Sequence, residues 1–218
     1  MDVLKISGLR ADVPGRTLFT GLDVEVRAGE ALAVVGPSGV GKSTLLNQVL
    51  GLAPAPVGEI EVAGRRMNGV SRAQAAAVRR ENIGVIFQDG ELIPELSARD
   101  NVAVAQMMMD RSGGGEERAG NLLDMLGVSP NTLARDLSGG ERQRAAIARA
   151  LVTDPAMILA DEPTGALDTL TRDEVADQLF SLVHEQGKAM LVVTHDETIA
   201  RRADRVVNLA DYALGRLR

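Results

Sequence analysis

Residues 36–44 read Gly-Pro-Ser-Gly-Val-Gly-Lys-Ser-Thr, and this segment constrains the fold more than any other part of the chain. It fits the pattern G-x-x-x-x-G-K-[ST] of a phosphate-binding loop. An apolar, β-branched run at residues 31–35 precedes it, and residues 43–50 carry leucine and valine at helical spacing. Strand, glycine loop and helix are the context that the pattern needs, because backbone N–H groups and a helix N-terminus then face one anion.

The loop therefore predicts a nucleotide phosphate site. Its expected binding residues are Gly36, Pro37, Ser38, Gly39, Val40, Gly41, Lys42, Ser43 and Thr44. Lys42 would reach the outer phosphates, and the hydroxyl of Ser43 would bind Mg²⁺.

Composition excludes several other classes of protein. The 218 residues have a net charge of −6 and no basic block, which argues against a nucleic-acid partner. No apolar stretch approaches the roughly 18 residues that could span a bilayer, and residues 1–10 lack the core of a signal peptide. Cysteine is absent, so thiol chemistry is excluded. We expect a soluble, cytoplasmic protein with an aliphatic core.

The order of the elements predicts an α/β fold. Short strands at residues 3–6, 22–26 and 31–35 precede the loop, and further strands are expected at 59–62, 83–87, 157–160, 189–193 and 205–209. Between residues 89 and 153 the apolar residues take helical spacing, which indicates a helical insertion. Alternating strands and helices imply a mostly parallel, doubly wound sheet with ligands at the carboxyl ends of its strands.

Two carboxylates follow one of these strands. Asp161 and Glu162 end the apolar run of residues 157–160, and Pro163 favours an extended backbone at Glu162. Adjacent side chains on an extended chain point to opposite sides, so the two acids can have separate roles. We expect Asp161 to orient Mg²⁺ and Glu162 to polarise the attacking water.

A second glycine motif, Leu137-Ser138-Gly139-Gly140-Glu141, precedes a helix expected at residues 142–152. Ser138 and Glu141 form a capping box, which needs no ligand. A capping box alone does not require two glycines, each of which costs about 1 kcal/mol in a helix. The glycines would let a phosphate approach the helix N-terminus, so the structural and functional interpretations coexist.

The glycine loop, the LSGGE segment, the LADE segment and a histidine after a strand occur in an order that resembles the ATP-binding cassette (ABC) ATPases. The resemblance extends over about residues 2–210. It implies a P-loop NTPase (RecA-like) core, with antiparallel N-terminal strands and an α-helical subdomain at 89–153, inside one domain whose core is residues 1–88 and 154–218. It also implies that the chain hydrolyses ATP with Mg²⁺.

The resemblance assigns further residues. Gln88 matches the glutamine that approaches Mg²⁺ and the attacking water, and His195 matches the histidine that contacts the γ-phosphate. Residues 166–168 match a loop that crosses a dimer interface. Ser138, Gly139, Gly140 and Glu141 would complete the ATP site of a second copy. The other histidine, His184, is expected on the surface.

One position departs from the family pattern. Val13 stands where an aromatic residue commonly stacks on adenine. The contact with the base should then be weaker and the discrimination between ATP and GTP poorer, or Val13 supplies only aliphatic packing.

The sequence around residues 67–70, 79–88 and 92–102 resembles the branch of the family that serves lipoprotein release, macrolide export and cell-division complexes. The implied partners are a second copy of the chain and a membrane permease, with the chain at the inner face of the membrane. A regulatory, non-transporting role of the cell-division type keeps the same motifs and stays open. Soluble ABC proteins of DNA repair need a long insertion after Gln88, for which there is no room before Leu137.

The helical insertion carries more apolar residues than a small subdomain needs: Ile93, Leu96, Val102, Val104 and Met107 to Met109. Two interpretations stay open. These residues either dock the membrane partner, for which methionine is well suited, or form the insertion's own core.

Overall fold

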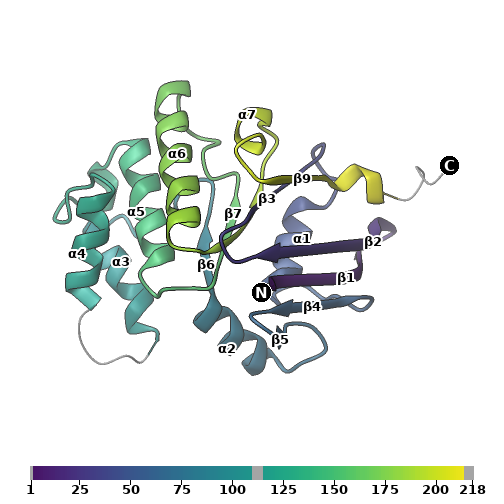
Figure 1. Ribbon diagram of the computed structural model, residues 1–218. Coiled ribbons are helices and arrows are strands. Elements are labelled where there is room, and N and C mark those ends of the chain that lie inside the picture. The colour runs from purple at the N-terminus through teal and green to yellow at the C-terminus, as the bar shows by residue number, and fades with distance from the viewer. Residues whose placement is uncertain (1, 110–114, 214–218) are drawn as a thin grey trace.

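The computed structural model describes residues 2–109 and 115–213, and its strands form two sheets (Figure 1). The parallel sheet has the order β6-β7-β8-β3-β9, made by Ile83–Ile86, Met157–Asp161, Ala189–Val193, Ala31–Val35 and Arg205–Asn208. The antiparallel sheet has the order β2-β1-β4-β5, made by Arg16–Arg27, Asp2–Val13, Glu59–Val62 and Arg65–Arg66. The expected mostly parallel sheet with antiparallel N-terminal strands is confirmed.

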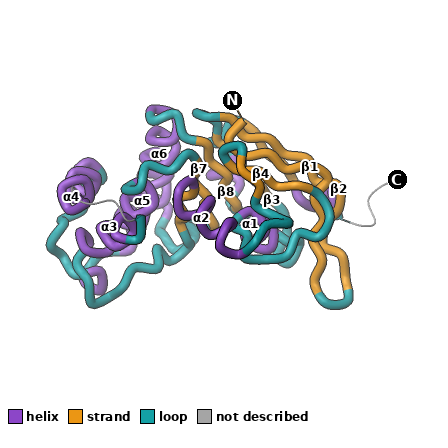
Figure 2. Tube along the Cα trace, turned by 90° about the horizontal axis from the view of Figure 1, so that it is seen from below, coloured by secondary structure: helices purple, strands orange, loops and turns teal. Residues whose placement is uncertain are grey.

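Helices lie on both sides of the parallel sheet. They are α1 (Lys42–Val49), α2 (Arg72–Asn82), α3 (Ala98–Met107), α4 (Gly115–Met125), α5 (Gly139–Leu151), α6 (Thr169–Glu185) and α7 (Glu197–Ala200), with the short helices η1 (Ala134–Asp136) and η2 (Leu209–Tyr212). Figure 2 shows α3, α4 and α5 gathered at one end of the molecule and the antiparallel sheet at the other. None of the helices in the described part of the chain is long and apolar enough to cross a bilayer.

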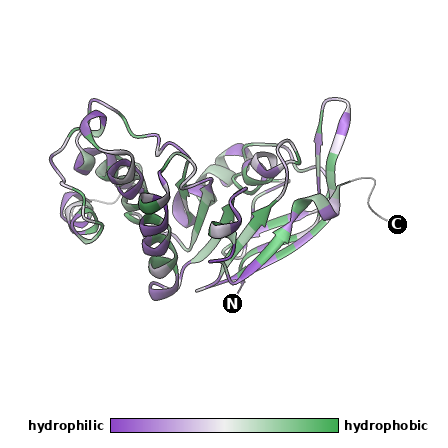
Figure 3. Cartoon of the chain, turned by 90° about the horizontal axis from the view of Figure 1, so that it is seen from above, coloured by the Kyte–Doolittle hydropathy of each residue, from purple (hydrophilic) through white to green (hydrophobic). Residues whose placement is uncertain are grey.

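Strand β3 divides two hydrophobic cores. Ala31 and Ala33 pack against the helices of one side, whereas Leu32 and Val34 pack against α1 and the antiparallel sheet. This alternation is what a strand buried on both faces produces. Figure 3 shows the hydrophobic colour concentrated on the strands between the layers.

The register of the parallel sheet aligns the ends of its strands. Val34 lies opposite Val193, and Val193 lies opposite Asp161, so β3, β8 and β7 end at one edge. The glycine loop, His195 and the two acids after β7 therefore share that edge, as expected for this topology.

Several local expectations were incomplete or wrong. Strands β1 and β2 have 12 residues each and form one long hairpin, and the short elements β5 and α7 were not expected. Helix α5 begins at Gly139 rather than at Arg142, because Ser138 caps it. Val102 is fully buried against the helices of the insertion, so it belongs to that core and not to a docking surface.

Gly84 tests how closely α5 packs on the parallel sheet. A Cβ atom at Gly84 would lie 2.3 Å from the carbonyl oxygen of Ala150. We expect Gly84→Ala to lower the free energy of unfolding by about 1–3 kcal/mol, because α5 would have to move away from β6. Urea unfolding followed by circular dichroism measures this change.

The matched control is Gly120→Ala in α4, where an added Cβ would meet no atom within 4 Å. In that variant the free energy of unfolding should rise by up to about 1 kcal/mol, because alanine has a higher helix propensity than glycine. If both variants unfold at the urea concentration of the original protein, the contact at Gly84 does not constrain the fold.

Candidate nucleotide-binding site

The glycine loop joins β3 to α1 in a shape that its glycines make possible. Gly39 and Gly41 have φ angles of 76° and 116°, which other residues rarely adopt. A Cβ at Gly41 would lie 3.1 Å from the ring of Phe19 and 3.2 Å from Leu18. Gly41 is also the N-cap of α1 and offers no capping side chain, so the first N–H groups of the helix are left for a ligand.

The side chain of Lys42 turns back over this loop. Its Nζ donates to the carbonyl oxygens of Gly36, at 2.8 Å, and Pro37, at 3.3 Å. The ammonium group is thus held beside the loop at the N-terminus of α1, where it could contact a bound anion.

These residues line a cavity of about 490 Å³. The expected site residues in its wall are Val13, Ser38, Gly39, Gly41, Lys42, Ser43, Thr44, Gln88, Asp161, Glu162 and His195. Two further lining residues, Arg16 and Leu18, were not expected. The structure therefore brings together residues from four separate motifs, as the sheet topology predicted.

Glu162 has a different backbone from the one expected. Its φ of 47° is left-handed rather than extended, a conformation that costs a non-glycine residue of order 1–3 kcal/mol. Hydrogen bonds hold the turn, because the N–H of Glu162 donates to Val193 and its carbonyl accepts from Gly165. The left-handed turn directs the Glu162 carboxylate toward Thr194, which follows β8.

There the Glu162 carboxylate meets His195 and Thr194. Its Oε1 lies 2.7 Å from His195 Nδ1 and accepts from the backbone N–H of His195 at 3.0 Å, and its Oε2 accepts from the hydroxyl of Thr194 at 3.0 Å. The carboxylate is mostly buried, with 15% of the side chain exposed, whereas the His195 side chain is 71% exposed. Thr194 carries no motif signal of its own and was not expected in the site.

Asp161 lines the same cavity. Burial raises the pKa of its carboxyl group, the neighbouring Glu162 raises it further, and Lys42 opposes the shift. A cation bound at this carboxylate would favour its ionised form. The hydroxyl of Ser43, the amide of Gln88 and the carboxylate of Asp161 all line this cavity, and oxygen donors of this kind suit Mg²⁺.

The LSGGE segment lies outside this cavity. None of Ser138, Gly139, Gly140 and Glu141 is among the residues that line it, and Ser138 and Gly139 are exposed. The capping box is formed: the N–H of Glu141 donates to the Ser138 hydroxyl, and the N–H of Ser138 donates to the Glu141 carboxylate at 2.9 Å.

Packing within one chain also explains why this segment has two glycines. A Cβ at Gly140 would lie 2.4 Å from Thr171 at the start of α6, and one at Gly139 would lie 3.3 Å from Leu167. Residues 166–168 thus pack against the start of α5. Asp168 caps α6 by accepting from the N–H groups of Leu170 and Thr171.

Three residues of the glycine loop that were expected to bind phosphate, Gly36, Pro37 and Val40, are not among the lining residues. His184 was expected on the surface. It is exposed, as expected, and its Nε2 lies 3.0 Å from the carboxylate of Asp204. This pair lies on the surface, outside the cavity lining.

Comparison with known proteins gives one consistent result. The family model described as "ABC transporter" matches residues 19–165, more than half of the chain. The lipoprotein-releasing system ATP-binding protein LolD of Gluconobacter oxydans is 45% identical, over 98% of this chain and 95% of its own. The LolD protein of Ruegeria sp. is 43% identical, over 97% of this chain and 96% of its own.

A solved structure agrees with these relatives. The ATP-binding cassette MJ0796, a dimer bound to ADP and Pi, superposes with a TM-score of 0.83 at 33% identity, covering 94% of this chain and 93% of its own. The similarity therefore extends over the core, the glycine loop and the helical insertion together.

The capping box at the start of α5 predicts a pH-dependent stability. Hydrogen bonds from the Ser138 hydroxyl and backbone lower the pKa of Glu141. A lowered pKa contributes stability above the unfolded-state value of about 4.3, and this contribution is lost as pH falls through the folded-state value. Glu141→Ala should lower the free energy of unfolding by about 0.5–1 kcal/mol at pH 7, and by less below pH 4.

Urea unfolding at several pH values measures this difference. The control is Glu95→Ala, an exposed glutamate outside the helices, for which we expect little change at either pH. A Glu141 variant whose deficit stays constant down to pH 3 would show that the ionised carboxylate does not stabilise α5.

Proposed function

Because this chain belongs to the ABC transporter family and is an ATP-binding, ATP-hydrolysing subunit of such a transporter, we propose that two copies form each ATP site together. The observation that supports this proposal is the position of Ser138 and Gly139. They are exposed at the start of α5 and do not line the cavity of their own chain. The N–H of Ser138 already donates to Glu141, so the N–H of Gly139, in the first turn of the helix, is the donor offered to a second copy.

Charge supports the same arrangement. A bound triphosphate carries about four negative charges, and at the phosphate end of the cavity the lining offers Lys42, with His195 nearby. The start of α5 from a second copy would add N–H donors and a helix N-terminus opposite the γ-phosphate. Closure of the dimer then depends on the γ-phosphate, and its loss on hydrolysis removes the contact that favours closure.

Within this site the side chains divide the work. We assign phosphate binding to Lys42 and the loop amides, and activation of the attacking water to Glu162, whose carboxylate His195 and Thr194 orient. Ser43, Gln88 and Asp161 would hold Mg²⁺, which supplies charge neutralisation at the phosphates when bound.

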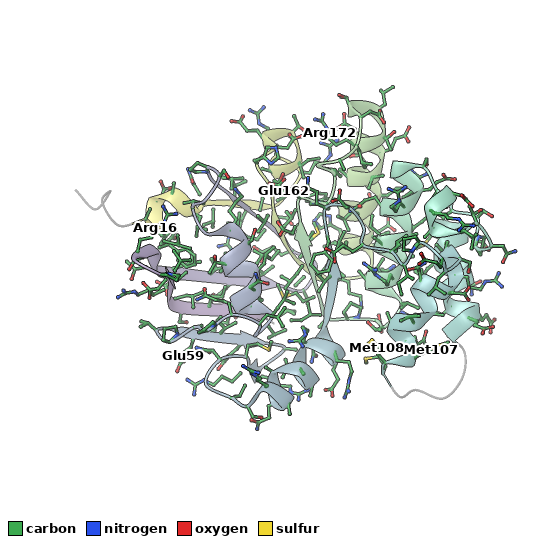
Figure 4. All side chains as sticks on the ribbon, turned by 180° about the vertical axis from the view of Figure 1, so that it is seen from behind. Arg16, Glu59, Met107, Met108, Glu162 and Arg172 are labelled. Carbon is green, nitrogen blue, oxygen red and sulfur yellow. The ribbon has the colours of Figure 1, made fainter. Side chains whose placement is uncertain are left out.

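We also propose that the chain docks on a membrane permease through a second groove and therefore works at the cytoplasmic face of the membrane. This groove, of about 470 Å³, lies where α2, β6, α3 and α5 meet. Arg79, Arg80 and Met108 contribute to its wall, and Met107 and Met108 are each 69% exposed at the end of α3 (Figure 4). Their flexible apolar side chains suit a partner helix.

The same groove is connected to the ATP site. Arg149, which also lines it, donates from Nη2 to the carbonyl oxygen of Gly90 at 2.6 Å, and Gln143 donates to Phe87 at 3.1 Å. Both residues belong to α5 and hold the segment around Gln88. A partner in the groove would therefore act on Gln88 and on the start of α5 together. Since the relatives are named for lipoprotein release, we propose lipid-anchored proteins as the cargo.

Glu162→Gln tests the composite site. The amide keeps the size of the side chain but cannot accept the proton of water, so we expect ATP binding to persist and turnover to fall by at least about 100-fold. Unhydrolysed ATP should then hold two copies together, which size-exclusion chromatography with light scattering would detect. A variant that binds ATP but stays monomeric at micromolar concentration would contradict the proposal.

Met108→Asp tests the docking groove. A charge at this exposed position should leave basal ATP hydrolysis unchanged but reduce the hydrolysis that the permease stimulates. The permease is the membrane protein that co-purifies with the chain, and mass spectrometry would identify it. The control is Met125→Asp in α4, which is 51% exposed and is not among the residues lining the groove. Equal loss of stimulation in both variants would place the docking surface elsewhere.

A further inference from the structure

The nucleotide cavity has two chemically different ends. Lys42, Asp161 and Glu162 lie at the end formed by the parallel sheet, and Val13, Arg16 and Leu18 lie at the end formed by the β1–β2 hairpin. Phosphates belong at the first end, because the glycine loop and the ammonium group are there. The sugar and the base of a nucleotide must then extend toward the hairpin.

The hairpin end offers no aromatic ring to a base. None of the residues that line the cavity is Phe, Tyr or Trp, and Phe19 is fully buried beneath Gly41. Val13 presents a half-buried aliphatic side chain. A purine at this end would therefore lack the π-stacking surface that usually binds it.

Among the described residues that line this end of the cavity, Arg16 is the cation. It begins β2 at the tip of the hairpin (Figure 4), and its Nη2 donates to the carbonyl oxygen of Gly39 at 2.6 Å. One of the guanidinium nitrogens is thus anchored on the phosphate-binding loop, 23 residues further along the chain. The guanidinium is therefore held at the loop, in the wall of the cavity that Val13 also lines.

The hairpin itself is braced just below this tip. Arg10 donates to the hydroxyl of Thr17 at 2.9 Å, and that hydroxyl donates to the Asp12 carboxylate at 2.6 Å. These bonds connect β1 to β2, so the position of Arg16 does not depend on the loop alone. The guanidinium is accordingly preorganised, which reduces the entropy lost when a ligand binds it.

We propose that Arg16 is the base-binding residue of this site and that its guanidinium plane stacks on the purine in place of an aromatic ring. Arginine stacks on nucleobases through its planar, weakly hydrated cation. Stacking needs only the π-face that every base has, so it does not select between adenine and guanine. This inference rests on the proposed binding of nucleotides by the chain. It identifies Arg16 as the residue that determines the affinity for the base, and it predicts weak selectivity between adenine and guanine.

Binding of ADP, GDP and pyrophosphate to the purified chain, measured by calorimetry with Mg²⁺, tests this inference. These ligands have no γ-phosphate, so their binding does not depend on hydrolysis or on closure of a dimer. Arg16→Ala should lower the affinity for ADP and for GDP by a similar factor, on the order of 3- to 10-fold. Pyrophosphate, which has no base, should bind with unchanged affinity. Arg16→Lys keeps the charge without the plane and should lose most of the same affinity for ADP.

Two further variants sharpen the result. Lys5→Ala removes a cation of the same hairpin that pairs with Glu25 and does not line the cavity, and we expect no change in the affinity for any of the three ligands. Adding Val13→Tyr to Arg16→Ala should restore ADP and GDP affinity, because it supplies a ring at the same end.

Some results would overturn the inference. Unchanged ADP affinity in Arg16→Ala would show that the guanidinium does not touch the base. An equal loss with pyrophosphate would show that Arg16 only braces the phosphate-binding loop. Failure of the original chain to bind ADP or pyrophosphate would instead remove nucleotide binding itself, and with it the premise.

Discussion

The free N–H groups at the start of α1 are the feature on which the rest of the molecule depends. They can face an anion only because Gly39 and Gly41 hold left-handed backbone angles and Gly41 offers no side chain. A side chain at Gly41 would also press on Leu18 and Phe19, which lie beside it. The antiparallel sheet is therefore part of the nucleotide site: its hairpin supplies the floor of the loop and, through Arg16, one of its walls.

Helix α5 connects the other parts of the mechanism. Its N-terminus carries the exposed Ser138–Gly139 tip, its middle holds the segment around Gln88 through Gln143, and Arg149 lines the groove proposed for docking. Gly140 and Gly84 let it pack tightly against α6 and β6 respectively. Because tightly packed interiors resist continuous deformation, α5 would move as one body. This property would link occupation of the groove to the completion of an ATP site.

The sequence predicted what local patterns encode. The apolar runs that end in Val35, Asp161 and Val193 are strands, and their shared edge follows from the rules for parallel sheets. Patterns along the chain could not reveal contacts between distant segments. Arg16 lies in no motif, and its role depends on a bond to Gly39 that only the folded hairpin creates. The left-handed angle of Glu162 arises from tertiary hydrogen bonds, and the burial of Val102 from packing among three helices.

Complementation between two inactive variants tests the central claim most directly. Lys42→Ala disables the phosphate-binding loop, and Gly139→Asp places a negative charge at the exposed tip of α5. Each variant alone should lack ATPase activity. An equimolar mixture should recover up to about a quarter of the original rate. Half of the dimers would contain one copy of each variant, and each of these dimers would have one intact site out of two. If Gly139→Asp alone hydrolyses ATP at the original rate, or if two folded variants regain nothing when mixed, then one chain does not complete the site of another.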